Sequence, residues 1–309
     1  MNRFARGALL FLVFAGVLAA QTTLYVTVGP YFYSFNALTG AAIAAPLGNT
    51  NSYTWQSALD GKGQLYVALY GQGQVGLYNA ATGATLNQTF LQTGVNTPTG
   101  LALWGNNLYV ASQPLQRISL YDATTGALAN ANFLTGFASP EYLLSDGNGR
   151  LYVSDYAGTV GVFDAATGAA INRNLVTGIA GVPMGMAVNT ANNRLYVASV
   201  QGNSVAVFDA TTGAMINSNL ISGLTSPRAL ALDPAGALYV SSYNSTGGYY
   251  QVGKFDGLTG AAINPTLLIN GGSITSLNIL AVPEPTTWVC LAIGVVWLGC
   301  CGWRRRRAT

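Results

Sequence analysis

The sequence predicts an all-β fold, a six-bladed β-propeller of four-stranded blades, followed by one C-terminal transmembrane helix. Two repeated motifs and the fit between the two ends of the repeat region indicate the propeller. A Leu-Tyr-Val tripeptide occurs six times at spacings of 41 to 44 residues. A period in the low forties in β-rich sequence is typical of one propeller blade per repeat. The six tyrosines are Tyr25, Tyr66, Tyr109, Tyr152, Tyr196 and Tyr239.

A second motif comes after each tyrosine at a nearly fixed distance. It consists of Asp or Asn, then Ala or Gly, then any residue, then Thr and Gly. Its first residues are Asn36, Asn79, Asp122, Asp164, Asp209 and Asp256. An Asp or Asn side chain accepts hydrogen bonds from backbone N–H groups two or three residues later. Equal placement in six repeats therefore predicts hairpin turns capped by these side chains. Asp60, Asp146, Asn189 and Asp233 recur after the first strand and receive the same interpretation.

The four strands of a blade can be assigned in two neighbouring repeats. Residues 229–232 form a first strand, a turn follows at 233–236, and residues 238–242 form a second strand. In the repeat before it, residues 205–208 supply the third strand and 214–221 the fourth. Short β-forming runs between Gly, Pro, Asn and Asp clusters are the strand signature. No segment between Gln21 and Val282 carries an apolar stripe of helical period.

The two ends of the repeat region complement each other. The region begins at a Leu-Tyr-Val strand, which is the second strand of its repeat, so a first strand is missing. Residues 276–281 remain after the sixth repeat as one extra strand. Pairing the two would complete the first blade and remove two open sheet edges. An open solenoid is the alternative, but it does not explain an extra strand that matches the missing one.

The C-terminal residues predict a membrane segment. An apolar run at 286–303 would span about 27 Å as a helix, close to the thickness of a bilayer core. The arginines after it predict a cytoplasmic C-terminus, with the propeller on the other side of the membrane. The motif before the run consists of Val282, Pro283, Glu284 and Pro285, and the arginine cluster of Arg304, Arg305, Arg306 and Arg307.

The N-terminal residues predict a signal peptide. Arg3 and Arg6 precede an apolar stretch at 8–18, and a cleavage site follows at Ala19 or Ala20. An uncleaved anchor is the alternative, but eleven apolar residues are too few to span a bilayer. The predicted organisation is a signal peptide at 1–20, a propeller at 21–281 and a C-terminal segment at 282–309.

The C-terminal order of Pro-Glu-Pro motif, hydrophobic helix and arginine cluster resembles the PEP-CTERM sorting signal of Gram-negative bacteria. The resemblance implies processing by signal peptidase and an exosortase. The precursor would be anchored in the inner membrane with its body in the periplasm, and the product would be attached to the cell surface or secreted, typically in producers of exopolysaccharide. The repeat itself resembles NHL and YVTN-type propellers and the SMP-30/gluconolactonase-like group. That likeness implies a fold and leaves function open.

Composition excludes several kinds of chemistry. The chain has no histidine, and its cysteines, Cys290, Cys300 and Cys301, all lie in the C-terminal apolar run. Histidine-dependent triads, thiol nucleophiles and zinc sites in the propeller are therefore excluded. Six of the 13 basic residues lie near the chain ends, which leaves 7 basic and 9 acidic residues between Gln21 and Val282. No basic patch for nucleic acid is expected.

Alignment of the repeats on the proline before the first strand places one side chain per blade at the central channel. These candidates are Trp55, Thr99, Glu141, Met184 and Arg228. One acid and one guanidinium predict no catalytic residue and no metal site, with Glu141 and Arg228 solvated or weakly paired at the channel mouth. Ca²⁺ is the one cofactor that oxygen ligands here leave open. Asp155 is predicted to be a solvated loop acid. The irregular insertion at 244–250 carries two tyrosines that could stack on a sugar ring.

Three functions remain open. The sequence favours an exported, non-enzymatic binding or structural module of the cell surface or extracellular matrix, whose partners would be exopolysaccharide or other exported proteins. The alternative is a metal-dependent, lactonase-like hydrolase with its site in the channel around Glu141. The third is a scaffold for other exported proteins. Both signals at the chain ends, the absence of catalytic residues and a polar, weakly charged propeller support the first.

Overall fold

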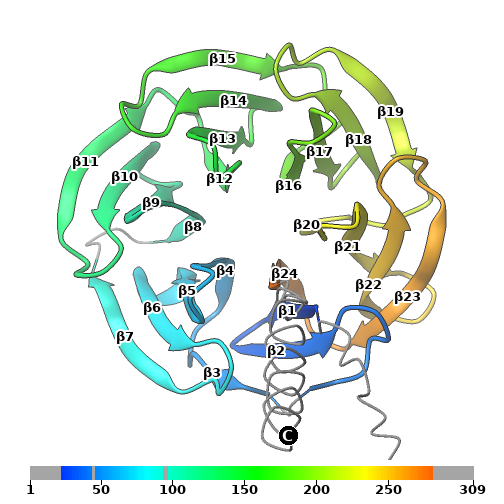
Figure 1. The fold of residues 1–309 in the computed structure, drawn as a ribbon, viewed down its shortest axis with the longest axis horizontal. Coiled ribbons are helices and arrows are strands. Elements are labelled where there is room, and N and C mark those ends of the chain that lie inside the picture. Colours follow the sequence, from blue (N-terminus) through cyan, green and yellow to red (C-terminus); the bar gives the residue numbers. More distant parts are fainter. Residues whose placement is uncertain (1–21, 44–45, 93–96, 281–309) are drawn as a thin grey trace, which may run out of the picture. The chain divides into compact units, whose positions relative to one another are not determined.

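Six antiparallel sheets surround a common axis in the computed structural model, which describes residues 22–43, 46–92 and 97–280. Each sheet has four strands, and the first strand of each blade lies nearest the axis (Figure 1). The predicted six-bladed propeller of four-stranded blades is confirmed. Among the described residues, no helix is long and apolar enough to cross a membrane. The segments predicted at 1–20 and 282–309 lie outside the described residues.

The strand bounds follow the repeat. Blade 1 contains β24 (Ile274–Leu280), β1 (Thr23–Val28), β2 (Tyr31–Asn36) and β3 (Gly48–Asn49). Blade 2 contains β4 (Thr54–Leu59), β5 (Gln64–Leu69), β6 (Gln74–Asn79) and β7 (Thr85–Gln92), with the 3₁₀ helix η1 (Tyr70–Gln72) after β5. Blade 3 contains β8 (Pro98–Trp104), β9 (Asn107–Ser112), β10 (Arg117–Asp122) and β11 (Leu128–Thr135).

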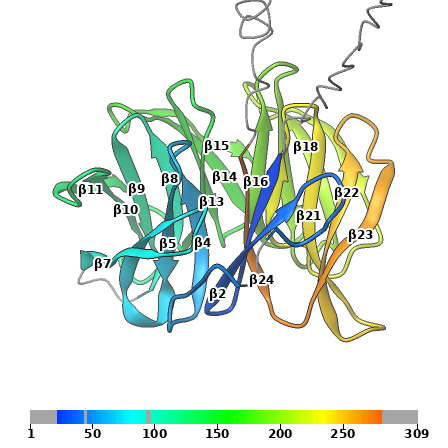
Figure 2. The ribbon, with the colours of Figure 1, turned by 60° about the horizontal axis from the view of Figure 1, so that its bottom comes forward.

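The other three blades repeat the pattern. Blade 4 contains β12 (Pro140–Ser145), β13 (Arg150–Asp155), β14 (Thr159–Asp164) and β15 (Ala170–Val176). Blade 5 contains β16 (Pro183–Asn189), β17 (Arg194–Ser199), β18 (Ser204–Asp209) and β19 (Met215–Ile221). Blade 6 contains β20 (Leu230–Leu232), β21 (Ala237–Asn244), β22 (Tyr249–Asp256) and β23 (Ala262–Asn270). Strand direction turns from the inner to the outer strand of each blade, as Figures 1 and 2 show, because sheets twist.

The first blade is built from both ends of the repeat region. Strand β24 pairs antiparallel with β1, with Leu24 opposite Ile279 and Val26 opposite Leu277. The extra strand predicted at 276–281 therefore completes this blade, and the ring is closed. The insertion predicted as irregular at 244–250 is instead the end of a regular hairpin. Tyr249 pairs with Asn244 and Tyr250 with Tyr243, so the two tyrosines are held by the sheet.

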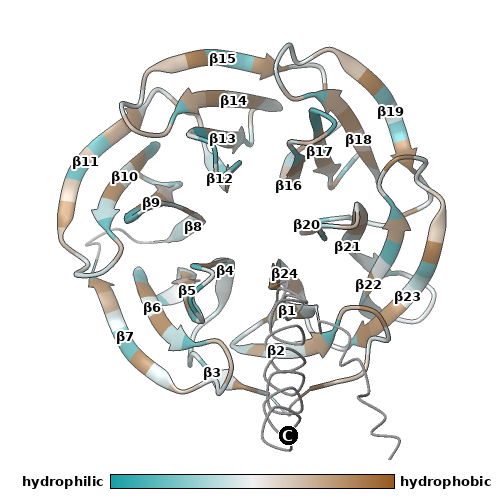
Figure 3. Ribbon diagram, in the orientation of Figure 1, coloured by the Kyte–Doolittle hydropathy of each residue, from teal (hydrophilic) through white to brown (hydrophobic). Residues whose placement is uncertain are grey.

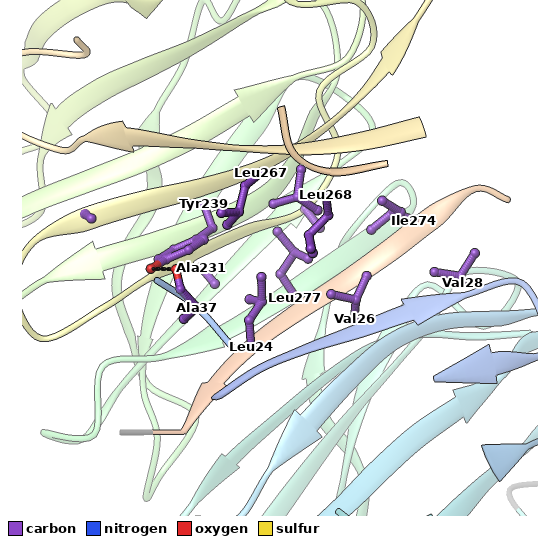
Figure 4. Close-up of a cluster of buried hydrophobic side chains, with 13 residues drawn as sticks. Leu24, Val26, Val28, Ala37, Ala231, Tyr239, Leu267, Leu268, Ile274 and Leu277 are labelled. Atoms are coloured by element: carbon purple, nitrogen blue, oxygen red, sulfur yellow. Dashed lines mark hydrogen bonds between the residues drawn. The ribbon is translucent and has the colours of Figure 1, made fainter. Parts of the chain in front are cut away.

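Apolar side chains fill the space between neighbouring blades. The second strands are buried on both faces because each blade packs face to face on the next. Figure 4 shows the cluster between blades 1 and 6, where Leu24 and Leu277 pack near Tyr239 and Leu268. The outer strands β15 and β19 are instead exposed over their first five residues and buried over their last two. Both hydrophobic and hydrophilic residues occur along them (Figure 3).

Within the described residues, the tyrosine motif and the turn motif contact each other across five of the six interfaces between blades. In five blades the tyrosine hydroxyl donates a hydrogen bond to the backbone carbonyl of the residue that follows the turn Asp or Asn of the next blade. The pairs are Tyr66 with Ala123, Tyr109 with Ala165, Tyr152 with Ala210, Tyr196 with Gly257 and Tyr239 with Ala37, at 2.5 to 3.3 Å. A buried tyrosine needs such a partner for its hydroxyl, and the two motifs therefore recur together.

The turn residues act as the caps that the sequence predicts. In blade 5 the Asp209 Oδ1 accepts the N–H groups of Thr211 at 3.0 Å and Thr212 at 2.7 Å. Gly213 ends the turn with φ +73°, and a Cβ there would lie 1.7 Å from the Leu175 carbonyl oxygen. Hydrogen bonds from the turn hold the pKa of these carboxyls below its usual value. The four are Asp122, Asp164, Asp209 and Asp256.

Candidate functional site

A pocket of about 220 Å³ lies on the propeller axis at one end of the channel. Its lining comes from blades 2 to 6, from the beginnings of the first strands and the connections that follow the second strands. These segments share one end of the ring because each first strand pairs antiparallel with the second, as Pro140 does with Asp155. Four of the five candidates line it, namely Trp55, Glu141, Met184 and Arg228.

Thr99 is the candidate that does not line the pocket. Its side chain is buried, and its hydroxyl donates a 2.8 Å hydrogen bond to the Pro140 carbonyl oxygen in the next blade. Blade 3 instead contributes Gln113, from the connection after β9. The expectation that Thr99 lines the channel mouth is therefore not met by this pocket.

Glu141 is buried at the base of this pocket, with 3% of its surface exposed. Its Oε1 accepts hydrogen bonds from Gln113 Nε2 at 3.0 Å and Ser139 Oγ at 3.4 Å. Its Oε2 is also buried and has no hydrogen-bond partner among the described residues. Burial raises the pKa of Glu141 to about 7, although the Ser139 hydrogen bond and the Arg228 charge act in the other direction. Of the two expectations for Glu141, solvated or weakly paired with Arg228, the first is wrong.

Arg228 faces the same pocket without forming an ion pair with Glu141. The one ion pair found within the described ranges joins Lys254 to Asp233 at 3.6 Å, away from this site. The Arg228 guanidinium carbon lies 6.0 Å from the centroid of the Trp55 ring. Its Nε is buried and, like Glu141 Oε2, has no partner in the described part of the chain. The pocket therefore holds one acceptor and one donor that the protein itself leaves unsatisfied.

Aromatic side chains form part of the wall and the rim. Tyr70, placed by η1, stacks on Trp55 with ring centroids 5.2 Å apart and an interplanar angle of 27°. Tyr156 is 54% exposed and reaches the pocket from the connection after β13. Trp55 therefore has Tyr70 and Arg228 as ring neighbours, which hold it in one orientation.

Asp155 supports this site from outside the pocket. It is 5% exposed, so the expectation of a solvated loop acid is wrong. Its Oδ2 accepts the N–H of Ala138 at 2.8 Å, and its Oδ1 accepts those of Ser139 and Ala157 at 3.0 Å. These bonds fix the segment that leads into β12 and carries Glu141. Asp155 is a positioning residue.

Bulges at the start of the first strands explain why adjacent side chains both reach the axis. The register of β4, β8, β12 and β16 shifts within their first residues, and a bulge turns a side chain from its alternating position. Glu141 lines the 220 Å³ pocket, whereas Tyr142 lines a second cavity of about 280 Å³ farther along the channel. Gln56, next to Trp55, lies at the same level as Tyr142 and also lines the second cavity.

The site offers a poor set of ligands for Ca²⁺, the cofactor that a lactonase-like channel would imply. Ca²⁺ takes six to eight oxygen ligands, several of them carboxylates. Within the described ranges no three acidic, histidine or cysteine side chains gather where they could hold a metal. Glu141 is the one carboxyl that lines the pocket. Asp155 lies outside the lining, and both of its oxygens already accept backbone N–H groups. The residues present do not fit a Ca²⁺ site.

A larger cavity of about 390 Å³ lies between the turns of blades 2 and 3. Its polar side chains serve the turns around it. Asp60 accepts the N–H groups of Lys62 and Gln64, and Asn106 donates to Asp122 and accepts from Thr124. Its polar groups are therefore satisfied, and the channel-mouth pocket is the stronger candidate.

Sequence reasoning missed four lining residues that share one position. Tyr70, Gln113, Tyr156 and Val200 each lie four residues after the tyrosine of their Leu-Tyr-Val motif. The residue one position earlier in each of these repeats is buried instead. These residues are Leu69, Ser112, Asp155 and Ser199. Alignment on the tyrosine with a shift of one residue would have found the four lining residues.

Comparisons with known proteins support the fold alone. No protein-family model matches the chain, and no curated protein matches it. Three solved structures are similar. A chain of a nidogen/laminin complex has a TM-score of 0.70 and 14% identity, over 84% of this chain and 99% of that one. A Bacteroides caccae protein of unknown function has a TM-score of 0.63 and 17% identity, over 85% and 99%. The computationally designed Ika8 protein has 0.52 and 14%, over 86% and 94%.

Proposed function

We propose that this chain is an exported, non-enzymatic β-propeller that binds a ligand at the mouth of its channel, at the cell surface or in the extracellular matrix. The observation that carries the proposal is the pocket between Glu141 and Arg228. It holds an unsatisfied acceptor and an unsatisfied donor beside fixed aromatic rings. Buried polar atoms without partners are rare in folded proteins. A polar ligand bound in this pocket would satisfy both atoms.

The same pocket favours binding over catalysis. Hydrolysis of an acyl bond needs a nucleophile or activated water with a base beside it, and donors for the developing oxyanion. The lining offers Glu141 as one carboxyl, with Gln113 and Ser139 as its hydrogen-bond partners. No histidine exists in the chain to serve as a second group. Ca²⁺-dependent hydrolysis of simple lactones, abolished by a chelator, would contradict this part of the proposal.

Export is supported by the two ends of the sequence. In the proposed organisation residues 1–20 are a signal peptide removed by signal peptidase, 21–281 an NHL- or YVTN-like propeller, and 282–309 a PEP-CTERM sorting signal cut by an exosortase. In this proposal, prolines on both sides of Glu284 would disfavour helix there and leave the motif accessible to a processing enzyme. Because β24 ends at Leu280, cleavage at 282–285 would leave the closing strand in its sheet.

The test is mass spectrometry of the surface and secreted fractions of a Gram-negative host, with and without its exosortase. The expected product lacks residues 1–20 and the arginine cluster, and the uncut precursor accumulates in the inner membrane when exosortase is absent. Alanine at Pro283 and Pro285 should have the same effect as loss of the enzyme. A mature protein that keeps its arginines in the intact host would overturn the sorting proposal. Recovery of exopolysaccharide or exported proteins with the mature form would identify the partner class.

A further inference from the structure

We infer that the pocket between Glu141 and Arg228 binds one neutral sugar ring without a metal, either as a free monosaccharide or as the end residue of a glycan. The inference rests on the proposed function in one respect: it names a ligand for the same pocket.

The polar groups suit a pair of neighbouring hydroxyls. Glu141 Oε2 can only accept a hydrogen bond when ionised, and Arg228 Nε can only donate one. Both are buried and unpartnered in the described part of the chain, and they line the same cavity. A hydroxyl both donates and accepts, so a vicinal diol can satisfy the two atoms at once. The bond to Arg228 is charge-assisted, and so is the bond to Glu141 when that carboxyl is ionised; such bonds are stronger than bonds between neutral groups.

Charge balance argues for a neutral ligand. Arg228 brings a positive charge to the pocket that no described ion pair neutralises, which disfavours an ammonium or a metal ion. Glu141 is a buried carboxyl in the same wall, which disfavours a carboxylate or phosphate when it is ionised. Opposite charges on two sides of one small cavity disfavour either kind of ion and suit a dipolar, uncharged molecule.

Shape and size point to a single ring. A cavity of about 220 Å³ lies below the range of roughly 300–1,000 Å³ that drug-sized ligands occupy. The C–H groups on one face of a pyranose form an apolar surface, and the rings of Tyr70 and Tyr156 supply apolar surface at the wall and rim. The buried Val182 and Met184 add further apolar surface to the lining.

The recognition groups are held in place before a ligand arrives. Gln113 and Ser139 bond to the other oxygen of Glu141, and Asp155 fixes the backbone of Ser139. Trp55 lies between Tyr70 and Arg228. Groups that are already ordered lose little entropy on binding, which favours affinity for a ligand as small as one sugar.

The test is calorimetric titration of the full-length protein, purified in mild detergent, with glucose, galactose and mannose and their methyl glycosides, in the presence of EDTA. We expect at least one of these sugars to bind. Glu141→Gln and Arg228→Gln should each weaken binding by about tenfold or more, since each removes one charge-assisted hydrogen bond. Tyr156→Ala should weaken it by a few fold. Tyr53→Ala, a change at a 77% exposed tyrosine outside the pocket, is the matched control and should leave affinity unchanged.

The probes distinguish the two sources of the ring. Equal or tighter binding of methyl glycosides and of a hexasaccharide indicates the end residue of a glycan, whereas loss of binding on methylation indicates a free monosaccharide. The inference is overturned if none of the neutral sugars binds, if only the corresponding uronic acids bind, if binding requires Ca²⁺, or if both pocket variants bind as well as Tyr53→Ala. Sugar binding by a protein that stays in the cytoplasm would reject the proposed export and leave this inference intact. An exported protein that binds no sugar would do the reverse.

Discussion

The hydroxyl of Tyr239 donates a hydrogen bond to the carbonyl oxygen of Ala37, 2.9 Å away and 202 residues earlier in the chain, and so joins the last blade to the first (Figure 4). The Lys254 ammonium lies 4.9 Å from the centroid of the same tyrosine ring and pairs with Asp233. Asp233 Oδ2 lies 3.1 Å from the Tyr239 hydroxyl oxygen and shares its single hydrogen with the Ala37 carbonyl. Ring closure thus depends on polar contacts as well as on the pairing of β24 with β1.

Tyr239→Phe is expected to lower the free energy of unfolding by about 1–2 kcal/mol, because it leaves the buried Ala37 carbonyl with only the 3.5 Å contact to Lys254. Urea unfolding followed by circular dichroism measures the loss. Tyr53→Phe, at an exposed position, is the control and should match wild type. A Tyr239→Phe protein as stable as wild type would show that packing alone closes the ring.

Gln56 joins three blades near the axis, and Gln56→Leu is expected to destabilise the protein by about 3 kcal/mol. Its amide donates to the Leu143 carbonyl at 2.7 Å and accepts the N–H groups of Leu101 and Leu143 at 2.9 and 3.0 Å. Leucine fills a similar volume but leaves buried backbone groups without partners. The exposed Gln72→Leu is the matched control. Equal unfolding midpoints for the two variants would contradict the prediction.

Gly213→Ala and Gly223→Ala separate backbone strain from close packing. Both glycines have φ +73°, so each change is expected to cost about 1–2 kcal/mol for the left-handed conformation. At Gly223 a Cβ meets nothing within 4 Å, whereas at Gly213 it would lie 1.7 Å from the Leu175 carbonyl oxygen. Gly213→Ala should therefore be the more destabilising of the two in thermal or urea unfolding. The reverse order would show that the turn moves freely relative to β15.

The pH dependence of stability is expected to carry the signature of Glu141. Its pKa is raised from 4.5 to about 7, chiefly by burial. A carboxyl with a raised pKa binds more protons folded than unfolded between the two values. The stabilisation that this carboxyl contributes is therefore complete below about pH 4.5. As pH rises to about 7, the free energy of unfolding falls by up to about 3 kcal/mol, and above that pH it no longer changes through Glu141.

Glu141→Gln should remove this decline, as urea unfolding at pH 4.5 and pH 8 would measure. The turn carboxyls Asp122, Asp164, Asp209 and Asp256 have lowered pKa values, so their stabilising effect is lost as pH falls, mostly below pH 3.8, and changes little between pH 4.5 and 8. Asp164→Asn, a change at a half-buried turn residue, is the control and should keep the wild-type slope between pH 4.5 and 8. An unchanged slope in Glu141→Gln would contradict the assignment.

Much of the fold could be predicted because its determinants are local and repeated. The spacing of the Leu-Tyr-Val tyrosines and of the turn Asp and Asn residues indicated the number of blades, the turns and their caps. The first repeat lacks a first strand, and this gap predicted that the extra C-terminal strand, β24, pairs with β1. Strand bounds differ from the predicted ones by one or two residues: β18 begins at Ser204 rather than at 205, and β21 ends at Asn244 rather than at 242.

The site could be predicted only in part. Proline alignment found Trp55, Glu141, Met184 and Arg228, which the structure brings into one pocket. It failed at Thr99, whose buried hydroxyl donates to the Pro140 carbonyl oxygen of the next blade instead of lining the pocket. It also took Asp155 for a solvated acid, although the burial and the N–H donors around it come from a neighbouring loop.

The repeat, the extra strand that matches the missing one and the absence of histidine all follow from the amino-acid sequence alone, because period, strand count and composition do not depend on contacts between distant residues. The folded chain was needed to show that Glu141 is buried, that Arg228 does not neutralise it, and that Tyr70 and Tyr156 reach the same cavity. Those facts depend on which side chains of five separate blades face the axis. A register shift of one residue, or one bulge, turns a side chain to the other face of its strand.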